Sequence, residues 1–260
     1  MADSVCVFAV CAGYGLSHLM PDRTVALWLL YACFVGDNLL QAEVARSGYH
    51  SIETLGAQEF ASTIDRVLAL YPRPIVEVQF NLLGSHDTPR FKTLARGDDS
   101  AYRLSTLFQM THPGAPSIYY GDEIGLEGGH DPGSRGAFPW DERLWDQDLR
   151  GYVKACISLR KAYPALRRGD FGWLFSGQGV VAYRRSLGDQ ALVVVLNTKS
   201  QPVTLDVPAA GLAEGSRLRD AWQGAAGSPV AEVTVSHGTL PGIRVPARSG
   251  VVLVTSPLGG

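Results

Sequence analysis

The chain has 260 residues, of which 46% are hydrophobic and 18% are charged, and its formal net charge at pH 7 is −2. This composition is typical of a folded globular protein and excludes an intrinsically disordered one. Because the 23 Lys and Arg residues are balanced by acids and form no long run, neither a nucleic acid nor a membrane surface is expected as a partner.

The first 56 residues are apolar and carry few structural signals. Their most hydrophobic run, VALWLLYACFV at 25–35, is shorter than the roughly 18–20 apolar residues that a membrane-spanning helix needs. The opening MADSVCVFAVCAGYG has no basic region of the kind that begins a secretory signal. We therefore expect a cytoplasmic protein in which residues 1–56 form an atypical apolar N-terminal segment.

Residues 57–165 alternate between helical and extended patterns. Apolar side chains recur at helical spacing from Ala57, and YPRP then ends that helix. Strands are predicted for IVEVQFNLL at 75–83 and APSIYYG at 115–121. Between them GDDSAYRLSTLFQMTHPG predicts a capped helix, and another helix is predicted from about 146 to 163, ended by Pro164. This order indicates a parallel α/β unit.

The pattern changes after Pro164. Short runs rich in β-branched residues follow, separated by turn residues and without helical spacing: GVVAYRRS, QALVVVLNT, QPVTLDVP, AEVTVSHG, GIRVPARSG and VVLVTS. They predict an antiparallel β-domain, a sandwich or barrel, over 166–260, with its boundary near 164–170. The expected fold class is therefore α/β plus all-β.

Polar residues gather in the two loops that follow the predicted strands, GSHDTPR and GDEIGLEGGHDPGSRGAFPWDE. In a parallel sheet such loops lie together at the carboxyl ends of the strands. Carboxylates beside aromatic rings, His and Arg suit an oxocarbenium-like transition state and an array of sugar hydroxyls. The candidate residues are His86, Asp87 and Arg90 from the first loop and Asp122, Glu123, Asp131, Arg135, Phe138 and Trp140 from the second.

A structural explanation of the same residues competes with this one. Asp87 could cap a turn, Arg90 could pair with a nearby acid, and Trp140 could fill core space. Spacing alone gives the two explanations equal weight.

The motif FNLLGSHDTPR, followed by HPGAPSIYYGDEIGLEGGHDPGSRGAFPWDE, resembles the α-amylase family, glycoside hydrolase family 13. It is most similar to the branch of cyclomaltodextrinases, neopullulanases and maltogenic amylases. The resemblance implies that 57–165 hold the last two βα units of a (β/α)8 barrel and that 166–260 form the C-terminal β-sandwich. It also implies that Asp87 is the transition-state-stabilising aspartate and that His86 bonds a sugar hydroxyl. Gly136 stands where the family commonly has a second Arg, which affects outer sugar contacts.

The family's retaining mechanism also needs a nucleophilic aspartate in an R-x-D motif and a glutamic acid proton donor. R-x-D occurs here only as RGD, at Arg96–Asp98 and Arg168–Asp170, and we interpret these as a helix start and an interdomain turn. The catalytic set is therefore expected to be non-standard, with Glu123 as the partner of Asp87. Further candidates are Asp122, Asp131 and Glu77, the last on a predicted strand face with Gln79 and Asn81.

Two functions follow from these residues. The first is a glycoside hydrolase or transglycosylase acting on small maltooligosaccharide-like or aryl-glycoside substrates. The second is a carbohydrate-binding or assembly fragment without catalysis. No phosphate loop, dinucleotide fingerprint or zinc spacing is present, so neither a cofactor nor a metal is expected. Because two barrel strands cannot close, we expect the open barrel face to be covered, by the apolar N-terminal segment or by a second copy in a homo-oligomer.

Overall fold

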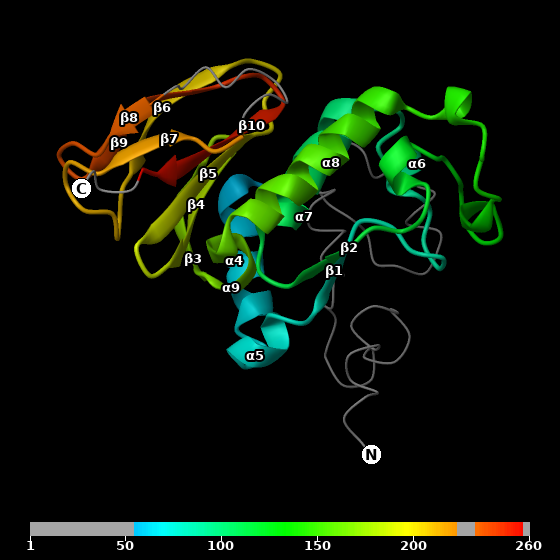
Figure 1. The fold of residues 1–260 in the computed structure, drawn as a ribbon, viewed down its shortest axis with the longest axis horizontal. Helices are drawn as coiled ribbons and strands as arrows, with labels where there is room; N and C mark the ends of the chain where they lie inside the picture. Colours follow the sequence, from blue (N-terminus) through cyan, green and yellow to red (C-terminus); the bar gives the residue numbers. More distant parts are fainter. Residues whose placement is uncertain (1–54, 223–231, 257–260) are drawn as a thin grey trace.

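The computed structural model describes residues 55–222 and 232–256, so the features predicted for 1–54 lie outside the described residues. An α/β unit is followed by a β-domain, and helices α7, α8 and α9 lie between the β-domain and the strand pair β1–β2 (Figure 1). The predicted fold class, part of an α/β barrel followed by an antiparallel β-domain, is confirmed. No helix in the described ranges is both long and apolar enough to cross a bilayer.

The three long helices begin and end where the sequence predicts. Helix α4 (Ala57–Leu68) buries Phe60 and Ile64. Helix α7 (Asp99–Thr111) begins at Asp98, whose side chain accepts a hydrogen bond from the Ala101 amide. Helix α8 (Gln147–Ala162) begins in the same way at Asp146 and stops before Pro164. Each aspartate cap satisfies an amide that the first helical turn leaves unpaired.

The parallel strand pair is shorter than predicted. Strand β1 (Phe80–Leu82) pairs in parallel with β2 (Ala115–Ser117), with Asn81 opposite Pro116. The prediction of a strand over all of 75–83 is wrong, because 73–76 form the short helix α5 (Arg73–Val76). Pro74, in the first helical turn, favours a helix there, since its fixed φ is already helical. The parallel direction of the pair is confirmed.

Short elements complete the α/β unit. Helix α6 (Phe91–Leu94) follows the first predicted site loop. The second loop contains the 3-10 turns η1 (Asp122–Ile124), η2 (Gly133–Arg135) and η3 (Glu142–Leu144). Helix α9 (Pro164–Arg168), which was not predicted from the sequence, begins at the proline that was expected only to end α8.

The β-domain consists of two antiparallel sheets. The larger has the order β3-β4-β5-β10-β7-β8, and the smaller pairs β6 with β9. Aliphatic side chains from both sheets, among them Val193, Val207 and Ile243, form one core between them, which confirms the sandwich. The strands are β3 (Asp170–Gly177), β4 (Val180–Leu187), β5 (Gln190–Asn197), β6 (Val203–Pro208), β7 (Arg217–Asp220), β8 (Glu232–Thr234), β9 (Thr239–Val245) and β10 (Ser249–Thr255).

Both R-x-D motifs are structural. Asp98 caps α7 and also binds Arg248, near the start of β10. Asp170, the first residue of β3, accepts a bond from Arg73 Nη1 at 2.6 Å. Both aspartates therefore join the α/β unit to the β-domain, as a helix start and an interdomain turn should.

His112 links pH to stability at the interface between the two units. Its ring is buried, and burial, together with the charges of Arg185 and Arg160, lowers the pKa of His112 to about 3. The unfolded imidazole titrates near ~6.5, so below that pH the unfolded chain binds a proton that the folded chain does not. We therefore expect the free energy of unfolding to fall as the pH decreases below about 6.5. Urea unfolding from pH 8 to pH 5 should show a flatter dependence for His112→Gln, and parallel curves would contradict this account.

Candidate functional site

The two predicted site loops lie together because β1 and β2 are parallel. Each loop leaves the carboxyl end of its strand, and the two are joined along their length. The Arg90 amide donates to the Gly128 carbonyl at 2.9 Å, and the Gly128 amide donates to Thr93 Oγ1 at 2.8 Å. The expected position of the site, at this end of the strand pair, therefore has a structural basis.

Four of the predicted residues form one exposed cluster. Asp87 Oδ2 lies 3.2 Å from His86 Nε2, and Asp87 Oδ1 lies 3.5 Å from Arg135 Nη2. Arg135 Nε also lies 3.0 Å from Asp131 Oδ1. The Asp87 side chain is 40% exposed, and the other three are more exposed. A ligand could therefore reach a carboxylate that has a cation on one oxygen and an imidazole on the other.

The backbone beneath this cluster is held by a residue that was not among the predicted ones. Ser134, in η2, donates from Oγ to the His86 carbonyl at 3.0 Å, and Arg135 Nε donates to the same oxygen at 3.2 Å. The Asp87 amide donates to Ser85 Oγ at 3.2 Å. The only sequence signal for Ser134 was its place between two predicted site residues.

Arg90 and Asp122 form a buried ion pair instead of lining the surface. Arg90 Nη1 lies 2.9 Å from Asp122 Oδ1, and the two side chains are 0% and 4% exposed. Arg90 also donates to the Tyr120 carbonyl at 2.6 Å and lies over the rings of Tyr119 and Tyr120. A ligand cannot reach a side chain that has no exposed surface. The prediction that Arg90 contacts a sugar is therefore wrong, and the competing explanation, that Arg90 pairs with a nearby acid, is confirmed.

The neighbouring carboxylates differ in their surroundings. Burial raises the pKa of Asp122 to about 7, although Arg90 acts to lower it. Tyr102 donates its hydroxyl to the Asp122 carbonyl at 2.9 Å, which fixes the backbone of η1. Glu123 Oε2 is buried and, among the described residues, has no hydrogen-bond partner. An oxygen of this kind is free to hold a proton.

Aromatic side chains form a group at the far end of the second loop. Phe138 packs edge-on against Trp140 and Trp145, with ring centroids 4.8 and 5.7 Å away. Trp140 is 83% exposed, so the competing explanation that it fills core space is wrong. Trp145 was not predicted as part of this group; its indole donates to the Pro139 carbonyl at 2.6 Å. The carbonyl of Gly136 accepts a bond from the Tyr120 hydroxyl at 2.7 Å.

Glu77 does not belong to the site. It ends helix α5 and pairs with Arg73 at 2.9 Å, so the predicted strand face shared with Gln79 and Asn81 is wrong. Its position is set by the helix that replaces the first half of the predicted strand. As a partner for Asp87 it is set aside.

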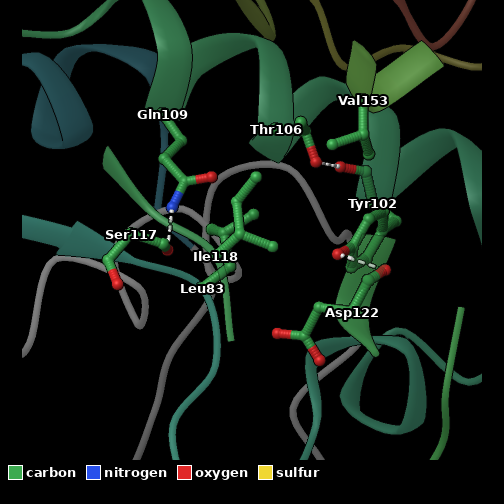
Figure 2. Close-up of a pocket in the computed structure, with 8 residues that line it drawn as sticks. All are labelled: Leu83, Tyr102, Thr106, Gln109, Ser117, Ile118, Asp122 and Val153. Carbon is green, nitrogen blue, oxygen red and sulfur yellow. Dashed lines mark hydrogen bonds between the residues drawn. The ribbon is translucent and has the colours of Figure 1, made fainter. Parts of the chain in front are cut away.

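A small cavity is lined in part by Asp122. It has a volume of about 10 Å³, room for about one water molecule, and it cannot hold a sugar ring. Figure 2 shows Asp122 at one end and Gln109 and Ser117 at the other. In the part of the chain that the structure describes, no three His, Cys, Asp or Glu side chains gather as metal ligands.

Comparisons with known proteins relate both the α/β unit and the β-domain to amylases. Residues 40–169 match the model of the α-amylase catalytic domain, and residues 174–242 match that of the maltogenic amylase C-terminal domain. The chain is 42% identical over 158 residues to a cyclomaltodextrinase of Geobacillus thermopakistaniensis, covering 60% of this chain and 27% of that protein. It is 45% identical over 151 residues to a cyclomaltodextrinase of a Bacillus species, covering 57% and 27%. The chain thus spans about a quarter of these relatives.

Solved structures extend the similarity through the β-domain. The protein Ttha1563 from Thermus thermophilus superposes with a TM-score of 0.79 at 34% identity, covering 88% of this chain and 47% of that one. A Nostoc punctiforme debranching enzyme, in crystals soaked with acarbose, superposes with a TM-score of 0.73 at 35% identity, covering 92% and 49%. With the parallel strand pair, the loop cluster around Asp87 and the β-sandwich in their expected order, the chain belongs to the α-amylase family.

Proposed function

We propose that this chain carries a glycoside hydrolase or transglycosylase site for small α-glucosidic substrates, either maltooligosaccharides or aryl glycosides, with Asp87 as an essential carboxylate. The observation that carries the proposal is the exposed cluster in which His86 and Arg135 hold the two oxygens of Asp87. The relatives are cyclomaltodextrinases, which supports a glucan as the substrate.

The proposed chemistry depends on charge. An ionised Asp87 stabilises the positive charge that develops on the sugar ring as the glycosidic bond breaks. His86 and Arg135 offer donors to sugar hydroxyls, Asp131 offers an acceptor, and Trp140 offers a flat apolar face. A second carboxyl group must transfer the proton, and Glu123 is proposed for it because its Oε2 has no partner among the described residues.

The test is hydrolysis of nitrophenyl α-maltoside by the full chain, run beside a calorimetric titration with acarbose. Release of nitrophenol that is lost in Glu123→Gln would support the role proposed for Glu123, and its loss in Asp87→Asn would support the role proposed for Asp87. The second candidate function, sugar binding without turnover, is favoured by the burial of Asp122 against Arg90, which removes one of the possible partner carboxylates from the site. Acarbose binding without nitrophenol release would establish that function in its place.

A homo-oligomer and a cytoplasmic location belong to the same proposal. Among the described strands β1 pairs with β2 alone, and Val78 and Phe80, beside and on β1, are 56% and 49% exposed. Large apolar side chains around an unpaired strand edge favour association. One of the relatives is an intracellular maltogenic amylase of Bacillus subtilis, which supports the location.

Sedimentation at micromolar concentration should show a mass larger than one chain. Phe80→Glu should reduce that mass, because a charge on the exposed apolar face opposes its burial. Thr204→Glu, on the β-domain, serves as the control and should leave the mass unchanged. A single-chain mass for the unsubstituted protein would exclude this association.

A further inference from the structure

Two donors from the second site loop converge on one backbone oxygen of the first. Ser134 Oγ and Arg135 Nε both donate to the His86 carbonyl, at 3.0 and 3.2 Å. This oxygen belongs to the planar peptide unit that also contains the Asp87 nitrogen. The two bonds therefore fix the backbone from which the Asp87 side chain extends.

The two donors differ in what else they can reach. Ser134 is fully buried, so its hydroxyl cannot touch a ligand that approaches from solvent. Arg135 is about half exposed and also contacts Asp131 and Asp87. Ser134 can therefore influence the site only through the His86 backbone, and a change at Ser134 separates backbone positioning from direct sugar contact.

The place of Ser134 is set by a close approach within its own loop. A Cβ atom at Gly128 would lie 2.4 Å from the Gly133 carbonyl oxygen and 3.1 Å from the Ser134 Cα, so these two parts of the loop touch. Gly128 is itself bonded to the amide of Arg90, at the end of the first loop, and to the hydroxyl of Thr93, in α6. The second loop therefore holds the first at two points, on either side of Asp87.

We propose that Ser134 is a positioning residue for Asp87, whose buried hydroxyl holds the His86–Asp87 peptide where the carboxylate meets a bound sugar. The proposal rests on the α-glucan function proposed above. The second loop then has two roles. It presents its own side chains to the ligand, as the sequence predicts, and it also orients the first loop.

The experiment compares Ser134→Ala with Ser105→Ala in the full chain. Ser105 is a matched control because it is also fully buried and its Oγ has no hydrogen-bond partner among the described residues. Losing one hydrogen bond shifts a local equilibrium by about two- to tenfold. We expect Ser134→Ala to speed amide hydrogen exchange in 83–91 by that factor and to weaken acarbose binding to a similar extent, with kcat reduced more than KM changes. Ser105→Ala should change none of these.

Ser134→Cys provides a second variant in case Ser134→Ala does not fold. A thiol is a weak donor of similar size, so its effects should lie between those of wild type and Ser134→Ala. If wild type binds acarbose but Ser134→Ala matches Ser105→Ala in exchange or in affinity, the positioning role is overturned. If wild type neither binds acarbose nor releases nitrophenol, the proposed function itself fails.

Discussion

Asp87→Asn is expected to lower kcat for nitrophenyl α-maltoside by about 10²–10³-fold or more, the loss typical of removing one preorganised electrostatic contact to a transition state. The substitution keeps the size of the side chain and leaves His86 and Arg135 in place. It removes the negative charge that opposes the positive charge on the reacting sugar. KM should change much less, since uncharged sugar hydroxyls can still bond to an amide.

Asp148→Asn is the matched control for that measurement. Asp148 is 89% exposed on α8 and pairs with Arg103, outside the loop cluster. Its replacement should leave kcat within about twofold of wild type, since an exposed ion pair contributes only about 0–1 kcal/mol. Equal rates for wild type and Asp87→Asn would exclude Asp87 as the essential carboxylate.

Arg90→Met is expected to lower the free energy of unfolding by about 3–5 kcal/mol, because it leaves a buried carboxylate without its counter-ion. Asp122 is 4% exposed, and Arg90 Nη1, 2.9 Å away, is the cation beside it. Without that cation the pKa of Asp122, already raised to about 7 by burial, should rise further. A carboxyl group whose pKa is raised by folding makes the protein less stable as the pH increases. The loss of unfolding free energy in Arg90→Met should therefore be larger at pH 8 than at pH 5.

The double variant Arg90→Met/Asp122→Leu separates this charge effect from a loss of packing. Replacing both members of a buried ion pair by apolar side chains is often neutral, so most of the lost stability should return. Urea unfolding of wild type, single and double variants measures each step. If the unfolding free energy of Arg90→Met lay within about 1 kcal/mol of the wild-type value, the Arg90–Asp122 pair would not stabilise the second loop.

Local signals predicted the helices and the position of the site. Helices α7 and α8 were predictable because an aspartate cap and a regular apolar spacing agree along their length. The loops around His86 and Asp87 were predictable because a parallel strand pair places both loops at one end. In both cases the determining residues are close in sequence or follow directly from strand direction.

Non-local contacts account for what the sequence could not predict. A charged Arg90 in a polar loop indicates exposure, and only the fold brings Asp122, 32 residues away, beside it and buries both. Ser134 carries no signal of its own, since the carbonyl that it bonds lies 48 residues earlier. Strand β7 (Arg217–Asp220) was missed because three of its four residues are charged, and its place in the sheet comes from pairing with β10.

We propose that the loops after β1 and β2 together bind an α-glucan. Backbone amide resonances of the full chain, followed during an acarbose titration, test it most directly. We expect saturable shifts for residues 83–91 and 126–140, with the β-domain strands from 170 onward unaffected. The absence of shifts in both loops, or shifts confined to the β-domain, would contradict it.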